Sequence, residues 1–229
     1  MLHAALDASG HVHIHNCCTS PVNLIHVEAS EPEYKLIAQQ FKDGWKHPSK
    51  TLPTIKRIFY VAYSGAGLVH LAKFSDYSNK VGNTLMLFHG TRRGCHIAES
   101  PTAVASCNSN TCNLCKILKG SYHMERAKGA RMFGPGIYST LISSKADDYT
   151  SNTDDTIMKN VKSRVMIVNH VALGRTKIMY EASHDTQHAP HLYNSVTAAT
   201  YPEGGKVNYH EAVVYREDAM CANAIIVYE

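Results

Sequence analysis

This sequence lacks long apolar runs, and its first residues lack the pattern of a signal peptide. No apolar stretch approaches the roughly 18 residues from which a membrane span is built, and the first residues lack the basic and then apolar pattern of a signal peptide. We therefore expect no membrane partner and an intracellular location, nuclear or cytoplasmic.

The sequence also lacks a large excess of either charge. The 23 lysine and arginine residues face 19 aspartate and glutamate residues, which leaves a formal net charge of +4, and no block of basic residues occurs. A surplus this small does not by itself indicate binding to nucleic acid. The seven cysteines are an odd number in a chain without a secretory leader, which favours a reducing compartment and thiols or a bound metal rather than disulfides.

Hydrophobic periodicity predicts a mixture of helices and strands in a chain of 229 residues, long enough to bury a core. Glu31-Pro32-Glu33 suits the first turn of a helix, because proline needs no amide hydrogen there and acids favour the positive end of the helix dipole. A second helix is expected over 68–81, with Leu68, Leu71 and Ala72 facing inward. Branched and apolar runs predict strands at Ile55–Tyr63, Thr84–Phe88, Arg164–Val171, Glu211–Tyr215 and Ala224–Tyr228.

The stretch 133–149 combines a flexible backbone with two aromatic rings. Gly134-Pro135-Gly136 ends any preceding element and lets the backbone approach a ligand closely. A strand is expected to follow, and Ser143 is a fair N-cap for a short helix through Tyr149. Such a segment can hold Tyr138 and Tyr149 on either side of a slot one flat ring wide. The alternative is that both rings only pack in the core.

Two further polar positions stand beside apolar strands. His89-Gly90-Thr91 ends the strand over 84–88, where a glycine backbone is open and the flanking side chains offer hydrogen-bonding groups. Such an edge can bind a primary amide through its backbone and a ribose through its side chains; the alternative is a capped strand end. Glu211 stands where a polar turn becomes a strand, so it can be held rigidly at a cleft, or it can be a solvated strand terminus.

A cysteine-rich stretch lies between these motifs and has little periodicity. Cys112-Asn113-Leu114-Cys115 is a C-x-x-C pair, and tetrahedral zinc takes four nitrogen or sulfur ligands. His96 and His123 are substitute ligands, and a set of buried thiols without metal is the alternative. The adjacent Cys17 and Cys18 are assigned as structural thiols. The predicted zinc ligands are Cys95, Cys107, Cys112 and Cys115.

Three motifs occur in one order: His-Gly-Thr, then Phe-Gly-x-Gly-Ile-Tyr with Ser-Ser-Lys-x-x-x-Tyr, then Glu-Ala-Val-Val-Tyr-Arg. Together they resemble the catalytic domain of the poly(ADP-ribose) polymerases, the diphtheria-toxin-like ADP-ribosyltransferases, and most closely its tankyrase-like and small mono-transferring members. The resemblance implies an N-terminal extension over 1–30 and a catalytic domain over 31–229. Residues 95–125 look like the cysteine-rich insert of some fungal and plant relatives.

The resemblance implies an α+β fold of two packed, mainly antiparallel sheets with flanking helices and an NAD cleft between them. It also implies a catalytic triad of histidine, tyrosine and glutamate, and a loop over 120–132 that covers the donor pocket. The family commonly has a serine directly after the lysine; Ala146 stands there, so Ser143 or Ser144 could compensate. The implied triad is His89, Tyr138 and Glu211, and the implied NAD-binding residues are His89, Gly90, Thr91, Gly136, Tyr138, Ser144 and Tyr149.

These implied roles amount to an expected activity. Gly90 would bind the nicotinamide amide, His89 and Thr91 the adenosine ribose, and the two tyrosines would enclose the nicotinamide ring. The enzyme would release nicotinamide from NAD+ and transfer ADP-ribose to a protein, itself included, in single units or short chains. Alternatives are a catalytically silent NAD or ADP-ribose reader with a partner-binding insert, and a transferase acting on nucleic acid. The arginine–serine–glutamate class is disfavoured, because Tyr209 stands where it needs a second glutamate.

Overall fold

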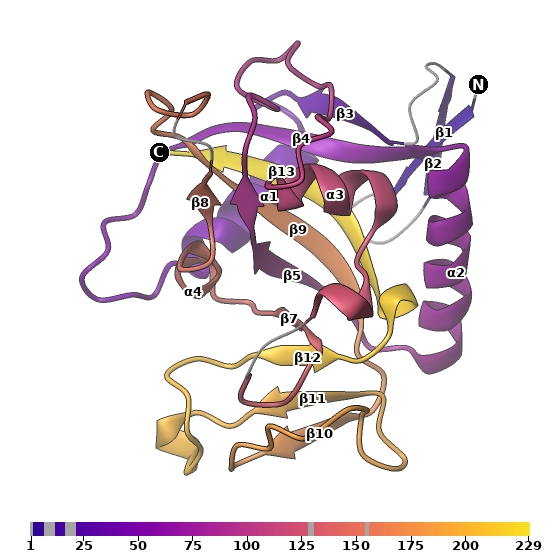
Figure 1. Cartoon of the computed structure of the whole chain (residues 1–229), viewed down its shortest axis with the longest axis vertical. Helices are drawn as coiled ribbons and strands as arrows, with labels where there is room; N and C mark the ends of the chain where they lie inside the picture. The colour runs from indigo at the N-terminus through magenta and orange to yellow at the C-terminus, as the bar shows by residue number, and fades with distance from the viewer. Residues whose placement is uncertain (1, 7–11, 17–21, 128–130, 154–155) are drawn as a thin grey trace.

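The computed structural model describes residues 2–6, 12–16, 22–127, 131–153 and 156–229, and it is an α+β structure with mostly antiparallel sheets (Figure 1). Cys17 and Cys18 lie outside the described residues. Among those described, the helices are α1 (Pro32–Asp43), α2 (Ala66–Val81), α3 (Asn113–Gly120) and α4 (Ser143–Asp147), with 3-10 turns η1 (Met124–Arg126), η2 (Tyr201–Glu203) and η3 (Glu217–Ala219).

The larger sheet has seven strands among the described residues, and all of its pairs are antiparallel. Its central strands are apolar and buried on both faces, as a sheet covered on both sides requires. The segment predicted as an N-terminal extension supplies three of its strands. In spatial order, the strands of the whole sheet are β2 (Val12–Asn16), β1 (Leu2–Leu6), β4 (Ile55–Ser64), β13 (Met220–Tyr228), β9 (Arg164–Ala172) and β5 (Thr84–Gly90). Strand β3 (Val22–Val27) also pairs with β4.

Helices cover the two faces of this sheet separately. On one face, Leu71 and Phe74 of α2 and Leu114 of α3 join the core formed by alternate residues of β4, β9 and β13. On the other face, Ile37 and Phe41 of α1 pack on the remaining alternate residues. The helix predicted over 68–81 is confirmed, but Ala72 is exposed, because the inward face of α2 continues through Phe74 instead.

A second, four-stranded sheet packs beside the first (Figure 1). Its order is β10 (Thr176–Met179), β11 (Ser195–Ala198), β12 (Ala212–Val214) and β7 (Ile137–Ser139); only β10 and β11 are parallel. A bridge between Phe88 and Thr140 joins the two sheets, with both backbone hydrogen bonds at 2.8 and 3.1 Å. Two short strands, β6 (Arg92–Arg93) and β8 (Ser151–Asn152), pair in parallel as a separate two-stranded sheet.

The strands expected from the sequence are confirmed, but the short helix differs from its prediction. Helix α4 ends at Asp147, before Tyr149, and its N-cap is Ile142, without a side-chain cap. Ser143 does not cap it, because its hydroxyl donates to the carbonyl of Phe41 at 2.6 Å. Ser143 therefore links the start of α4 to the last turn of α1.

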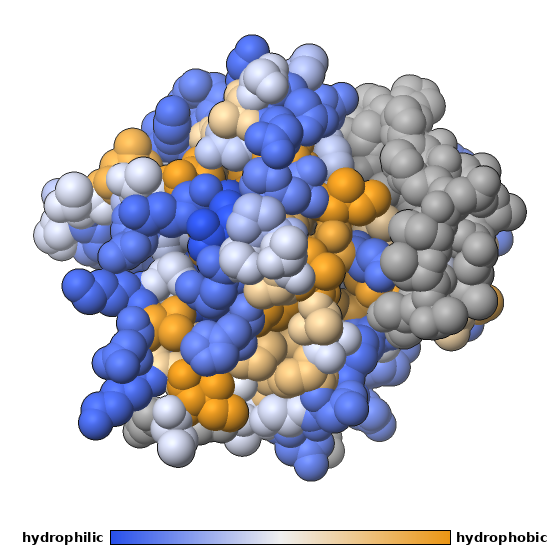
Figure 2. Space-filling view, turned by 90° about the horizontal axis from the view of Figure 1, so that it is seen from above, coloured by the Kyte–Doolittle hydropathy of each residue, from blue (hydrophilic) through white to orange (hydrophobic). Residues whose placement is uncertain are grey.

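On the face shown in Figure 2, hydrophilic and hydrophobic residues are interspersed. None of the helices formed by the described residues has both the length and the apolar character needed to cross a membrane.

Candidate active site

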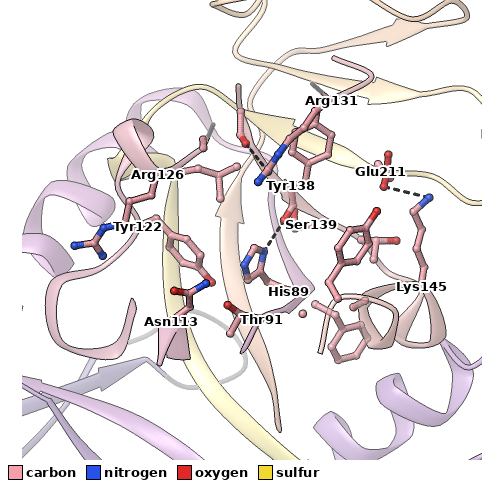
Figure 3. A pocket seen from close by; sticks show the side chains of 18 of the residues that line it. His89, Thr91, Asn113, Tyr122, Arg126, Arg131, Tyr138, Ser139, Lys145 and Glu211 are labelled. Atoms are coloured by element: carbon pink, nitrogen blue, oxygen red, sulfur yellow. Dashed lines mark hydrogen bonds and ion pairs between the residues drawn. The ribbon is translucent and has the colours of Figure 1, made fainter. Parts of the chain in front are cut away.

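A cavity of about 1280 Å³ lies where the two sheets meet, and residues from β5, β7, α3, α4 and the approach to β12 line it. Figure 3 shows its side chains. The structure brings together in this cavity all but one of the residues that the sequence assigned to the donor site. Those present are His89, Gly90, Thr91, Gly136, Tyr138, Tyr149 and Glu211.

Strand pairing explains why residues so far apart in sequence converge. The bridge between Phe88 and Thr140 sets the end of β5 beside β7. Strand β12 pairs with β7 so that Ala212 faces Ser139, and Glu211 directly precedes Ala212. The end of β5, the end of β7 and the start of β12 therefore lie together. The polar residues of these three segments lie where the pairing of their apolar residues stops.

Gly90 and Gly136 are required by close approach rather than by turn geometry. A side-chain carbon at Gly90 would lie 1.8 Å from the carbonyl oxygen of Ala146, and one at Gly136 would lie 2.2 Å from Val213. Both contacts are shorter than atoms tolerate, so α4 and β12 can only pack this closely against glycine. Helix α4 then delivers Tyr149 to the cavity rim, where it is 63% exposed.

His89 is held in one tautomer. Its Nδ1 lies 2.8 Å from the carbonyl oxygen of Tyr138, and a carbonyl can only accept, so Nδ1 carries the hydrogen. Burial lowers the pKa of His89, although this carbonyl opposes the change, so the ring is neutral near pH 7. Nε2 is then a hydrogen-bond acceptor. The ring of Tyr122 meets His89 edge to face at 5.2 Å.

Tyr138 is held in place through its hydroxyl, which forms two hydrogen bonds. Its hydroxyl accepts from the backbone N–H of Phe133 and donates to the carbonyl of Gly134, each at 3.0 Å. Burial raises the pKa of Tyr138 to about 12, so the phenol stays protonated. The guanidinium of Arg131 lies 5.3 Å from the ring centroid. The ring is thus a rigid aromatic surface rather than an acid or base.

Glu211, one of the acids that line the cavity, forms an ion pair. Glu211 lies 3.1 Å from the ammonium of Lys145 on α4, and the two side chains are only 12% and 16% exposed. Figure 3 shows this pair beside Tyr138. Sequence reasoning missed Lys145, Tyr122 and Arg131 as cavity residues. The lysine lies inside the Ser-Ser-Lys motif, which was the available signal, and the other two belong to the segment expected to cover the pocket.

Ser144, which the resemblance implied as an NAD-binding residue, does not line the cavity. Its hydroxyl oxygen accepts the backbone N–H groups of Lys46 and His47 at 3.0 and 3.1 Å, and its side chain is buried away from the cavity lining. The hydroxyl of Ser143 donates its hydrogen bond to the backbone carbonyl of Phe41. Both serines face the end of α1, so neither replaces the hydroxyl that is missing at Ala146.

The four predicted zinc ligands do come together. The Sγ atoms of Cys95, Cys107, Cys112 and Cys115 all lie within 4.8 Å of one another, so the cluster could hold a metal ion such as zinc. Two sulfurs about 2.3 Å from a tetrahedral zinc lie about 3.8 Å apart, and the distances from Cys95 to Cys115 and Cys112 are 3.5 and 3.8 Å.

The thiols of this cluster share hydrogen bonds that shift their pKa values in opposite directions. Hydrogen bonds from Cys115 and then Cys95 lower the pKa of Cys112, whereas the hydrogen bond with Cys112 raises the pKa of Cys95 and of Cys115, so Cys112 is the first of the three to become the thiolate that binds zinc. The substitute ligands proposed from the sequence are not part of the cluster. His96 is exposed, and His123 has its Nδ1 3.5 Å from the carboxylate of Glu217.

A comparison with protein-family models finds no match, and neither does a comparison with curated proteins. The assignment of a function therefore depends on the residues of the cavity.

Proposed function

We propose that this chain is an NAD-dependent ADP-ribosyltransferase of the histidine–tyrosine–glutamate type, with the fold of that family. The observation that carries the proposal is the convergence of three separate segments on one cavity. His89, Tyr138 and Glu211 line it together with Gly90 and Tyr149. Each of these residues belongs to one of the sequence motifs that resemble that family.

The donor would bind through groups that the fold already holds in place. Gly90 lines the cavity, and its backbone is the candidate partner for the nicotinamide amide. Aromatic faces attract a cationic pyridinium ring, and Tyr138 and Tyr149 both line the cavity. The free Nε2 of His89 can accept a ribose hydroxyl, and the hydroxyl of Thr91 can join it.

The reaction breaks the bond between the ribose carbon C1′ and the nicotinamide nitrogen, which leaves with the bonding electrons. Positive charge develops on the ribose, and a carboxylate that accepts a hydrogen bond from the 2′-hydroxyl stabilises it. Glu211 can do this and can orient an acceptor, whose oxygen or nitrogen forms the new bond to C1′ and passes its proton to this carboxylate. Lys145 holds the carboxylate in position.

A silent reader of NAD or ADP-ribose is the second candidate function. It is favoured by Ala146, because the structure places the two neighbouring serine hydroxyls on other partners. Such a protein would keep the aromatic slot but bind the amide more weakly.

Incubation with NAD+ carrying a label on its adenosine half tests the proposal. Protein acceptors, including the chain itself, and RNA ends are offered in parallel. We expect label to become covalently attached to protein and nicotinamide to be released in equal amount. Attachment to RNA instead would identify a nucleic-acid transferase. Binding of NAD+ without release of nicotinamide would overturn the transferase proposal and support the reader.

We also propose that Cys95, Cys107, Cys112 and Cys115 bind one structural zinc ion. Four cysteine ligands leave no open position for water, which is typical of a structural rather than a catalytic site. Helix α3 carries Cys115 on one side and Lys116 and Ile117 at the cavity, so the metal would fix one wall of the cavity.

A further inference from the structure

The hairpin formed by β1 and β2 carries histidines on both of its strands. Its antiparallel register pairs His3 with His15, and His13 with Ala5. Figure 1 shows the two strands together near the N-terminus, and within the part of the chain that the structure describes β2 pairs with β1 alone. The fold therefore brings histidines from two strands together at the edge of the larger sheet.

The three histidines share one face of this hairpin. Register partners in an antiparallel pair lie on the same face, and so do residues two apart along one strand. His3 is the partner of His15, and His13 precedes His15 by two positions. The opposite face is mostly apolar, and its pairs are Leu2 with Asn16, Ala4 with Ile14, and Leu6 with Val12.

These positions suit three ligands of one metal ion. Directly opposite Cβ atoms in an antiparallel pair lie about 4.5 to 5.5 Å apart, as for His3 and His15, and diagonal positions lie about 7 to 8 Å apart, as for His3 and His13. Nitrogen ligands about 2.0 to 2.1 Å from a tetrahedral zinc ion lie about 3.3 Å from one another. Imidazole rings reach far enough beyond Cβ to close this difference, so histidines at these positions can share one ion.

An ion at this place would join strands that have few other anchors. Strands β1 and β2 pair with each other over five positions, but β1 pairs with β4 over only two, at His3 and Ala4. A two-stranded hairpin is at best marginally stable by itself, and the outer strand of a sheet is open to pairing with other chains. A metal ion bound across the hairpin would fix β2 to β1 and stabilise this edge.

We propose that His3, His13 and His15 bind one zinc ion, separate from the ion of the cysteine cluster. Neutral imidazole is a common zinc ligand, and three histidines leave the fourth tetrahedral position open to water. Three ligands hold the ion less tightly than four cysteines do, so this site fills when zinc is supplied. No step of the proposed transfer reaction uses these histidines, so the site is independent of the proposed function.

Equilibrium dialysis of the untagged chain against micromolar zinc tests the site. The parent chain should bind about one zinc ion more than His13→Asn/His15→Asn, as a single three-ligand site requires. The matched control, His188→Asn/His191→Asn, removes two exposed histidines that are remote in sequence, and it should bind as much zinc as the parent. All of these chains keep the four cysteines, so the difference between them does not depend on how much zinc the cysteine cluster holds.

The ligand on the other strand is tested by His3→Asn, which should weaken the binding of this ion by about 10²-fold. Amide hydrogen exchange of the parent chain gives a measurement that requires no variant to fold, because added zinc should slow exchange in both β1 and β2. Equal zinc binding by the parent and His13→Asn/His15→Asn, an equal loss in the control, or unchanged binding by His3→Asn would overturn the inference. Exchange in β1 and β2 that zinc leaves unchanged would also contradict it.

Discussion

Among single residues, Glu211 carries the charge on which the proposed chemistry depends. Glu211→Gln keeps the shape and removes the charge, so transfer should fall by roughly 10²-fold or more while donor binding persists. The measurement is the rate of automodification with labelled NAD+. Glu181→Gln, at an exposed carboxylate outside the cavity lining, is the matched control and should transfer at the parent rate. Undiminished transfer by Glu211→Gln would remove Glu211 from the mechanism.

The two tyrosine rings can be tested with a nicotinamide mimic. At about 100 times its dissociation constant, benzamide should stabilise the folded chain by roughly 2.7 kcal/mol, which for this size is about 5 to 10 °C in Tm. Tyr138→Ala should abolish most of this shift, because it removes one stacking face. Tyr180→Ala, at an exposed ring outside the cavity lining, should keep it. A full shift in Tyr138→Ala would place the mimic elsewhere.

Among the elements, α4 depends on one buried carboxylate. Asp147 accepts hydrogen bonds from Lys50, Tyr228 and Arg164, at 2.8 Å each, and its side chain is 3% exposed. Burial alone would raise its pKa, but these partners, Lys50 first, lower it. This single residue ties α4 to the region before β4, to β13 and to β9.

The pH dependence of stability follows from that lowered pKa. The contribution of Asp147 is fully present above the unfolded-state pKa of about 4 and is lost as pH falls through the lower folded-state value. Asp147→Asn should therefore destabilise the chain by roughly 3 kcal/mol at pH 7, and the difference should shrink below about pH 4. Urea unfolding at both pH values measures it. Asp148→Asn, at a carboxylate that is 52% exposed, should cost much less.

Helix α3 gives the test of the metal site. Purified protein should contain about one zinc per chain, as a closed four-ligand site requires, and Cys115→Ala should lose both the metal and part of the stability. Cys221→Ala removes a buried thiol outside the cluster and should retain the zinc. Metal-free parent protein with unchanged Tm would instead identify the four cysteines as plain buried thiols.

For the whole molecule, local patterns predicted the elements well and predicted side-chain directions less well. The strands that end at Gly90 and begin after Glu211 could be read from apolar runs, because burial on both faces leaves few other structures for them. Ser144 could not be placed, since its direction is set by the backbone of Lys46 and His47, remote in sequence. The pairing of Lys145 with Glu211 depends likewise on how α4 meets β12, which no local pattern encodes.

The central place of β13 has a consequence for how the protein folds. This strand pairs Ala224 with Tyr60 on one side and with Val168 on the other, so it closes the larger sheet between segments that are made much earlier. Until it docks, β4 and β9 each keep an open apolar edge, which is the kind of edge that recruits other chains. Contacts between such remote segments also fold slowly, on the scale of milliseconds to seconds. During synthesis, the facing edges of β4 and β9 therefore stay unpaired until β13 has been made, and aggregation is favoured most in that interval.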